Sequence, residues 1–180
     1  FRDSHPDVQL QLLEATLDVQ MAAFDADEID AGFVLHAPGA APPGFAALAV
    51  QQEPLVMALP DSHPAAARPA LRLLEVAAEP LVIFPRAIAP SLFDSVLAAY
   101  RAHGATPHIG QEAIQMQTIV NLVSAGMGVA WVPESVTRLQ RPGVAYRAVT
   151  DSGLRCETSL VWREGAAPVV QRFVQHVQAH

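Results

Sequence analysis

The stretch MQTIVNLVSAGMGVAWV, residues 116–132, carries the clearest periodic pattern in this sequence. Its first half places apolar side chains at the i, i+3, i+4 and i+7 positions of one helix face: Met116, Ile119, Val120 and Val123. Gly126 is expected to end this helix, because glycine readily adopts the left-handed backbone found after helices. Residues 129–132 form an apolar run that Pro133 ends, which predicts a buried strand.

Elements of the same two kinds alternate on both sides of this stretch. Strands are predicted at residues 8–12, 29–35, 45–50, 55–59, 81–84, 107–111, 144–149 and 160–163, and helices at 17–27, 71–77, 91–103 and from 168 onward. Residues 8–35 are predicted to form a βαβ unit with parallel strands. Ser91, followed three residues later by Asp94, predicts a capped helix start. The predicted fold class is α/β.

Composition excludes several classes of protein. The 180 residues are 51% hydrophobic and 16% charged, which excludes a disordered chain or a coiled coil. All 11 basic residues are arginine, and the net charge of -7 argues against a surface that grips nucleic-acid phosphates. The single cysteine, Cys156, excludes an internal disulfide. The N-terminus has no basic and apolar export signal, so a cytoplasmic location is expected.

One uncharged segment has the length of a membrane span. Residues 113–133 contain no charged side chain over 21 positions. They do contain glutamine, asparagine and glycine, and side-chain amides are costly in hydrocarbon. A buried helix followed by a buried strand is therefore expected instead.

Signals for catalysis or metal binding are poor. Asp61, Ser62 and His63 are neighbours in a predicted turn, which does not make a catalytic triad. The pair Gly126 and Gly128 lacks the third glycine of a dinucleotide fingerprint. The seven histidines show no metal-binding spacing. We expect no enzyme, no cofactor and no metal site.

A series of short motifs runs along almost the whole chain. It comprises Phe1-Arg2 with Pro6-Asp7-Val8, the segment IDAGF at 29–33, Leu59-Pro60 with His63-Pro64, Phe84-Pro85-Arg86, PSLFD at 90–94 and the helix-and-glycine segment at 116–129. Their order and spacing resemble the C-terminal effector-binding (substrate-binding) domain of LysR-type transcriptional regulators. The resemblance is greatest to regulators of aromatic-compound breakdown.

The resemblance implies an architecture. It is the fold of type 2 periplasmic binding proteins, with two Rossmann-like lobes and a ligand cleft between them. Lobe I is expected at residues 1–52 and 153–180, and lobe II at 53–152. Two features of the family are missing from this sequence: the DNA-binding winged helix-turn-helix with its linker helix, and the first strand of lobe I.

The resemblance also implies a function. A small, anionic metabolite such as an aromatic or dicarboxylic acid would bind between the lobes and shift the geometry of a homodimer or tetramer. DNA would be bound only through a domain outside these residues, and transcription would be controlled in that way. A solute-binding protein of a transport system and a small enzyme are the alternatives.

Five of the expected ligand-binding residues lie at helix starts. In an open α/β sheet, ligands bind at the C-terminal ends of strands and at helix N-termini. The positions that fit are Thr16, Ser91, Leu92, Gln115 and Met116. The resemblance supports Thr16 and the segment at 91–92. Thr16 and Ser91 are equally explained as helix caps, and Met116 as a core residue.

Arg86 and His36 complete the expected site. Arg86 follows a predicted strand of lobe II, and its guanidinium suits a carboxylate. A surface arginine paired with Glu79 or Asp94 is the alternative. His36 lies near the place where some relatives of the family carry a ligand-binding arginine, and a solvent-facing loop histidine is the alternative.

Overall fold

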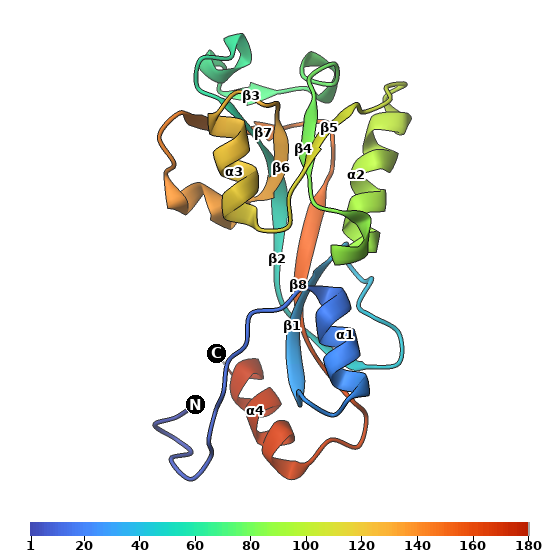
Figure 1. Cartoon of the computed structure of the whole chain (residues 1–180), viewed down its shortest axis with the longest axis vertical. Helices are drawn as coiled ribbons and strands as arrows, with labels where there is room; N and C mark the ends of the chain where they lie inside the picture. The colour runs from blue at the N-terminus through green and yellow to red at the C-terminus, as the bar shows by residue number, and fades with distance from the viewer. Residues whose placement is uncertain (180) are drawn as a thin grey trace. The chain divides into compact units, whose positions relative to one another are not determined.

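The computed structural model describes residues 1–179, apart from the side chain of residue 139. Its contacts divide the chain into two compact units (Figure 1). Unit 1 comprises Phe1–Gln52 together with the residues from Glu157 onward, and unit 2 comprises Glu53–Cys156. The chain therefore returns to unit 1 between Cys156 and Glu157, a few residues beyond the expected point near Gly153.

Unit 1 contains an antiparallel strand pair. Strand β1 (Ala31–His36) pairs with β8 (Arg155–Trp162), so that Ala31 faces Trp162 and His36 faces Glu157. Helices α1 (Leu17–Asp25) and α4 (Pro168–Gln178) complete the unit. Buried Phe24, Val34 and Val161 form its core.

Unit 2 contains a parallel strand pair beside an antiparallel sheet. Strand β4 (Leu81–Ile83) runs parallel to β5 (Ile109–Glu112), and a parallel bridge between Leu81 and Val129 places it next to β6 (Ala130–Pro133). The other strands are β3 (Ala70–Leu71), β7 (Val144–Val149) and the second half of β2 (Ala46–Pro60), whose first half belongs to unit 1. Strand β2 is antiparallel to both β6 and β7, and β3 is parallel to β7.

Helices and short 3₁₀ turns surround these strands. The two α-helices of unit 2 are α2 (Pro90–Ala102) and α3 (Met116–Ser124). The 3₁₀ segments are η1 (Pro64–Ala67), η2 (Leu73–Glu75), η3 (Arg86–Ile88) and η4 (Glu134–Leu139). Both α-helices bury one apolar face, with Leu92, Val96 and Tyr100 from α2 and Ile119, Val120 and Val123 from α3.

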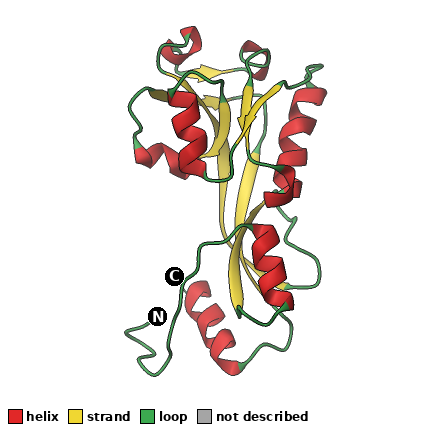
Figure 2. Cartoon of the chain, viewed as in Figure 1, coloured by secondary structure: helices red, strands yellow, loops and turns green. Residues whose placement is uncertain are grey.

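The strand predicted at residues 8–12 is wrong. This segment is irregular and is drawn as loop in Figure 2. Leu12 and Leu13, after its alternating residues, are 77% and 65% exposed. A strand needs a neighbour for its backbone hydrogen bonds, and no described strand pairs with this segment. The predicted βαβ unit is wrong for the same reason, since β1 pairs with β8 in an antiparallel manner.

Two strands predicted at 45–50 and 55–59 are one continuous strand, β2. The Glu53-Pro54 step was expected to separate them. Proline removes only one backbone donor, and the next residue resumes hydrogen bonding, with the Leu55 N–H donating to the Leu154 carbonyl at 2.9 Å. The strand therefore passes through the proline and runs from unit 1 into unit 2.

The helix predicted at 71–77 is replaced by β3 and η2. Contacts with distant residues explain the difference. The Leu73 N–H donates to Asp151 Oδ1 at 2.8 Å, and Leu71 pairs with Val149 of β7. These tertiary partners hold the segment in a conformation that local helix propensity does not favour.

The predicted capping of α2 by Ser91 is also wrong. The helix begins at Pro90, Ala89 occupies the N-cap position, and no side chain caps the helix there. Proline suits a first helical position because its missing N–H would have no partner in the helix. Asp94 forms an ion pair with Arg86 instead of reaching back to the start of the helix.

The uncharged segment at 113–133 divides into α3, a turn and β6. Its helix has nine residues. Among the residues that the structure describes, no helix has both the length and the apolar composition needed to cross a bilayer.

Candidate functional site

The C-terminal ends of β4 and β5 define one edge of unit 2. The pairing of these strands is continued by the Ala113 N–H, which donates to the Ile83 carbonyl at 3.0 Å. Beyond β4 the chain enters η3 and α2, and beyond β5 it enters α3 (Figure 1). Because the two strands are parallel, both helices begin at the same edge. This edge is where open α/β sheets bind ligands.

The start of α3 offers backbone donors. Gln115 is exposed at the N-cap position, and its side chain makes no capping hydrogen bond. The first N–H bonded within the helix is that of Ile119, which donates to the Gln115 carbonyl at 3.0 Å. The preceding amides point out of the helix, and its first turn contains no acidic residue. Met116, at the first helical position, is only partly buried. This helix start suits an anionic group.

The start of α2 has similar electrostatics but different side chains. Its first turn also lacks an acidic residue. Ser91 is partly buried, whereas Leu92 is 2% exposed and belongs to the core. Leu92 is therefore placed to contribute its backbone N–H to a ligand, not its side chain.

Arg86 is engaged by Asp94. Its Nε and Nη2 atoms donate to the two carboxylate oxygens of Asp94 at 2.9 and 2.7 Å. This hydrogen-bonded pair holds the pKa of Asp94 below its usual value and raises that of Arg86. The structure thus shows the pairing that was the alternative to ligand binding. A carboxylate ligand would have to share or displace Asp94.

In unit 1, Thr16 occupies the N-cap position of α1 but does not cap it. Its hydroxyl donates to Asp18 Oδ1 at 2.5 Å. This hydrogen bond holds the pKa of the Asp18 carboxyl below its usual value. A carboxylate therefore already occupies the first turn of α1, and it disfavours a second anion there.

His36 lies at the end of β1 and is buried, with 2% of its surface exposed. Its Nδ1 donates to the Ala37 carbonyl at 2.7 Å, and its Nε2 lies 3.0 Å from Ser159 Oγ. The Ser159 hydroxyl lies 3.2 Å from Glu157 Oε1, to which it can donate. The solvent-facing loop histidine considered as the alternative is wrong. His36, Ser159 and Glu157 form a polar cluster, which we call the His36 cluster.

The structure groups the seven predicted residues in two sets. Arg86, Ser91, Leu92, Gln115 and Met116 lie in unit 2, at or next to the two helix starts described above. Thr16 and His36 lie in unit 1. Sequence reasoning missed Ser159 and Glu157, because a serine and a glutamate in a strand give no sign that a histidine lies opposite on a neighbouring strand.

The part of the chain that the structure describes contains no metal-binding cluster and no accessible thiol. No group of three histidine, cysteine, aspartate or glutamate side chains is arranged there to hold an ion. Cys156 is 1% exposed. Burial, together with the nearby Glu53 charge, raises the pKa of its thiol to about 12.

Cys156 is therefore expected not to react with a thiol reagent in the folded protein. At pH 8 the thiol is both protonated and inaccessible, and the thiolate is the reactive form. Labelling by a chromogenic disulfide reagent should be complete in denaturant and should fall to the rate of unfolding without it. Rapid labelling of the native protein would show that β8 opens at Cys156.

Comparison with known proteins identifies the family. The family model for the LysR substrate binding domain matches residues 1–180. The HTH-type transcriptional regulator IlvR of Caulobacter vibrioides is 43% identical over 181 residues, which cover 98% of this chain and 60% of that protein. This chain thus spans about three fifths of the length of that relative.

Two solved structures show the same fold. The BenM effector binding domain with its effector benzoate superposes with a TM-score of 0.79 at 22% identity, over 99% of this chain and 81% of that one. The effector binding domain of QuiR in complex with shikimate gives 0.84 at 16% identity, over 97% and 82%. The predicted α/β fold of the type 2 periplasmic-binding-protein kind is confirmed. The chain belongs to the LysR substrate-binding domain family.

Proposed function

We propose that this chain is the effector-sensing domain of a LysR-type transcriptional regulator and that its effector is a small carboxylic acid. Units 1 and 2 are the two lobes of that domain. The choice of an acidic effector is supported by the two helix starts at one edge of unit 2. Neither helix has an acidic residue in its first turn. Helix N-termini stabilise negative charge through their unpaired amides and the helix dipole.

The relatives support this choice. Benzoate and shikimate, named with BenM and QuiR, are both carboxylic acids. IlvR is named as a transcriptional regulator, which favours a regulator over the solute-binding alternative. The complete protein would act in the cytoplasm as a homodimer or tetramer and bind DNA through a helix-turn-helix outside these residues. Acid binding would shift the population between two states of that assembly.

Within the proposed site, the N-terminus of α3 is expected to contribute most to acid binding, and Arg86 less. The α3 amides are available without any rearrangement of side chains. Arg86 is 62% exposed and already paired, so its contribution requires Asp94 to share the guanidinium. Thr16 and His36 remain proposed contacts from unit 1, although Asp18 and the His36 cluster engage their side chains.

A single substitution tests whether the N-terminus of α3 binds the acid. Thr118 is exposed at the third position of α3, so Thr118→Asp places a carboxylate among the amides. This change should stabilise the free helix by up to about 1 kcal/mol, yet weaken acid binding at least about tenfold through repulsion and competition for the amides. Thr118→Asn, which has the same shape without the charge, is the matched control and should bind nearly as the unmodified protein does.

The measurement is a thermal-shift and calorimetric screen with benzoate, muconate, shikimate and related acids. An acid at about 100 times its dissociation constant should add about 2.7 kcal/mol of stability. An acid that binds Thr118→Asp as tightly as Thr118→Asn would place the effector elsewhere. Binding of only uncharged compounds would contradict the proposal.

A further inference from the structure

The His36 cluster extends over three neighbouring strands. The sheet order places β8 between β1 and β2. His36 lies on β1, and Ser159 and Glu157 lie on β8. Gln52 of β2 joins the cluster, because its Nε2 donates to Glu157 Oε2 at 3.4 Å. All four residues belong to unit 1, so one polar network links its three strands.

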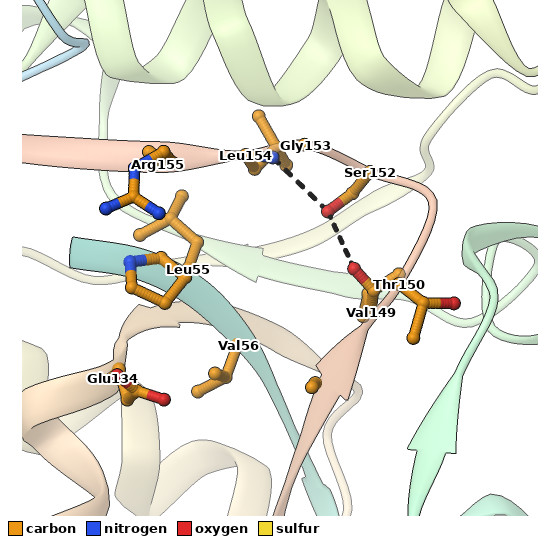
Figure 3. Close-up of a pocket in the computed structure, with 11 residues that line it drawn as sticks. Leu55, Val56, Glu134, Val149, Thr150, Ser152, Gly153, Leu154 and Arg155 are labelled. Atoms are coloured by element: carbon orange, nitrogen blue, oxygen red, sulfur yellow. Dashed lines mark hydrogen bonds between the residues drawn. The ribbon is translucent and has the colours of Figure 1, made fainter.

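Two members of this network mark the places where the chain passes between the units. Gln52 is the last residue of unit 1 on β2, and Glu157 is the first residue of unit 1 on β8. On the unit 2 side, the same strands are joined by the Leu55 N–H, which donates to the Leu154 carbonyl at 2.9 Å. Figure 3 shows this part of both strands, with Leu55 and Leu154 labelled. The contact between Gln52 and Glu157 therefore joins the two crossings of the chain.

Glu157 places a carboxylate next to a buried histidine. The Nε2 atom of His36 lies 3.9 Å from Glu157 Oε1. The histidine side chain is 2% exposed and the glutamate side chain 13%. Burial disfavours a charged ring, whereas a carboxylate at this distance favours it. The charge of the ring therefore depends on how the polar groups around it are arranged.

Other charged groups lie on the elements around the cluster. Glu53 accepts two hydrogen bonds from Ser135. Asp18 is bonded to Thr16, and Asp25 is paired with Arg163. The charged or titratable residues on the strands and helices of this region, besides His36 and Glu157, are Asp18 and Asp25 on α1, Glu53 on β2, Arg155 and Cys156 on β8, and Arg172 and His176 on α4. Glu157 is the acid that lies at ion-pair distance from the His36 ring.

The hydrogen atoms of the cluster have two possible arrangements. The Nδ1 atom of His36 lies 2.7 Å from the Ala37 carbonyl, which can only accept, so Nδ1 carries a hydrogen in both. The Ser159 hydroxyl has one hydrogen, and it lies 3.0 Å from His36 Nε2 and 3.2 Å from Glu157 Oε1. A neutral ring accepts that hydrogen at Nε2. A protonated ring donates from Nε2 to Ser159, and the serine hydrogen then passes to the Glu157 side.

We propose that the His36 cluster is a proton switch at the crossings of the chain. Uptake of one proton from solvent at His36 Nε2 rotates the Ser159 hydroxyl from the ring to Glu157. The carboxylate that binds Gln52 thereby gains a second donor from the neighbouring strand, and loss of the proton reverses the change. Histidine suits this role because its charge changes near physiological pH.

The switch gives the crossings a dependence on pH. Any rearrangement that moves β2 against β8 at Gln52 and Glu157 is linked to proton uptake by His36, and this linkage is reciprocal. The inference does not depend on the proposed acid site.

Nuclear magnetic resonance of the ¹⁵N-labelled 180-residue chain tests the switch without any substitution. Between about pH 8 and pH 5, the Nε2 signal of His36 should change from that of an unprotonated to that of a protonated nitrogen. Nδ1 should be protonated throughout. The side-chain amide signals of Gln52 should shift with the same midpoint, because Glu157 is bonded to both Gln52 and Ser159. The ring of His108, which is exposed in unit 2, is the internal reference.

Two variants distinguish a switch from a merely structural cluster. Glu157→Gln should weaken proton binding by His36 at least about tenfold, because the nearby carboxylate favours the charged ring. Ser159→Ala removes the connecting hydroxyl, so the Gln52 signals should no longer follow the ring. Glu134→Gln removes the same charge from an exposed position of unit 2 and should leave both titrations unchanged.

Four results would overturn the proposal. The His36 ring keeps one charge state over this pH range, its neutral form carries the hydrogen on Nε2, Gln52 does not respond to the ring, or Glu157→Gln titrates as Glu134→Gln does. Far-UV circular dichroism should show that each variant is folded. The unmodified chain decides the question through Gln52 even if a variant does not fold.

Discussion

Gly128→Ala is expected to lower the free energy of unfolding of unit 2 by about 3 kcal/mol or more. Gly128 has φ +141, a backbone conformation that side chains other than glycine rarely adopt. A Cβ added there would lie 2.1 Å from the Pro80 carbonyl oxygen. That oxygen accepts the Val129 N–H at 2.9 Å, and the Val129 carbonyl accepts the Val82 N–H at 2.8 Å. The methyl group would therefore separate β4 from β6.

Gly126→Ala is the matched control two residues away. Gly126 also has a positive φ, of +79, but a Cβ added there meets nothing within 4 Å. Gly126→Ala should therefore lower the free energy of unfolding only by the backbone strain, about 1–2 kcal/mol. Trp131 lies in β6 of unit 2, so its fluorescence during urea unfolding, in a Trp162→Phe background, reports this unit. Equal losses for the two alanine variants would contradict the close approach to Pro80.

His36→Ala is expected to destabilise unit 1 by about 2–4 kcal/mol. The substitution removes a fully buried ring and both of its hydrogen-bonded contacts, with Ala37 and with Ser159. Ser159 is itself 1% exposed, so water cannot replace the lost partner without opening β1 and β8. The cost combines a cavity with the loss of one of the two polar partners of the buried Ser159 hydroxyl, which keeps its contact with Glu157.

Trp162 lies in β8 of unit 1, and its fluorescence in a Trp131→Phe background follows this change. His108→Ala, at an exposed histidine of unit 2, is the control and should change stability by less than about 0.5 kcal/mol. His36→Gln, which keeps a donor and an acceptor, should recover part of the loss. A loss below about 1 kcal/mol for His36→Ala would mean that the His36 cluster does not support unit 1.

The elements that sequence predicted well are those with a strong local pattern. Helix α3 and strand β6 lie within a residue or two of the predicted bounds, because apolar spacing and glycine act over a few residues. Helix α2 was also predicted, but its capping by Ser91 was wrong. Asp94 could reach either the helix start or Arg86, and only the folded chain shows that it pairs with Arg86.

The predicted elements that failed are those whose form depends on a distant partner. Residues 8–12 have the alternation of a strand, yet no described strand lies beside them. The helix expected at 71–77 is replaced because Asp151 and β7 supply hydrogen bonds from nearly eighty residues away. Such partners are invisible to any window along the sequence.

The candidate site divides in the same way. The start of α3 at Gln115 and Met116 could be located from the sequence. It is a candidate anion site because the backbone amides of a helix N-terminus favour negative charge. The interactions of the individual side chains could not be predicted from the sequence. Arg86 is paired with Asp94, Thr16 donates to Asp18 and Leu92 is buried. Each side chain had more than one neighbour or environment within reach, and the folded chain decides which of them it takes.

By itself, the sequence determined the α/β class, the family and the helix starts that suit an acid, because apolar periodicity and short motifs are local properties. Only the tertiary structure decided the His36 cluster. This cluster joins residues from separate elements, with His36 next to Ser159 across paired strands. Hydrogen bonds and ion pairs require atoms within a few ångströms, and that proximity is produced by the fold of the chain and not by its order.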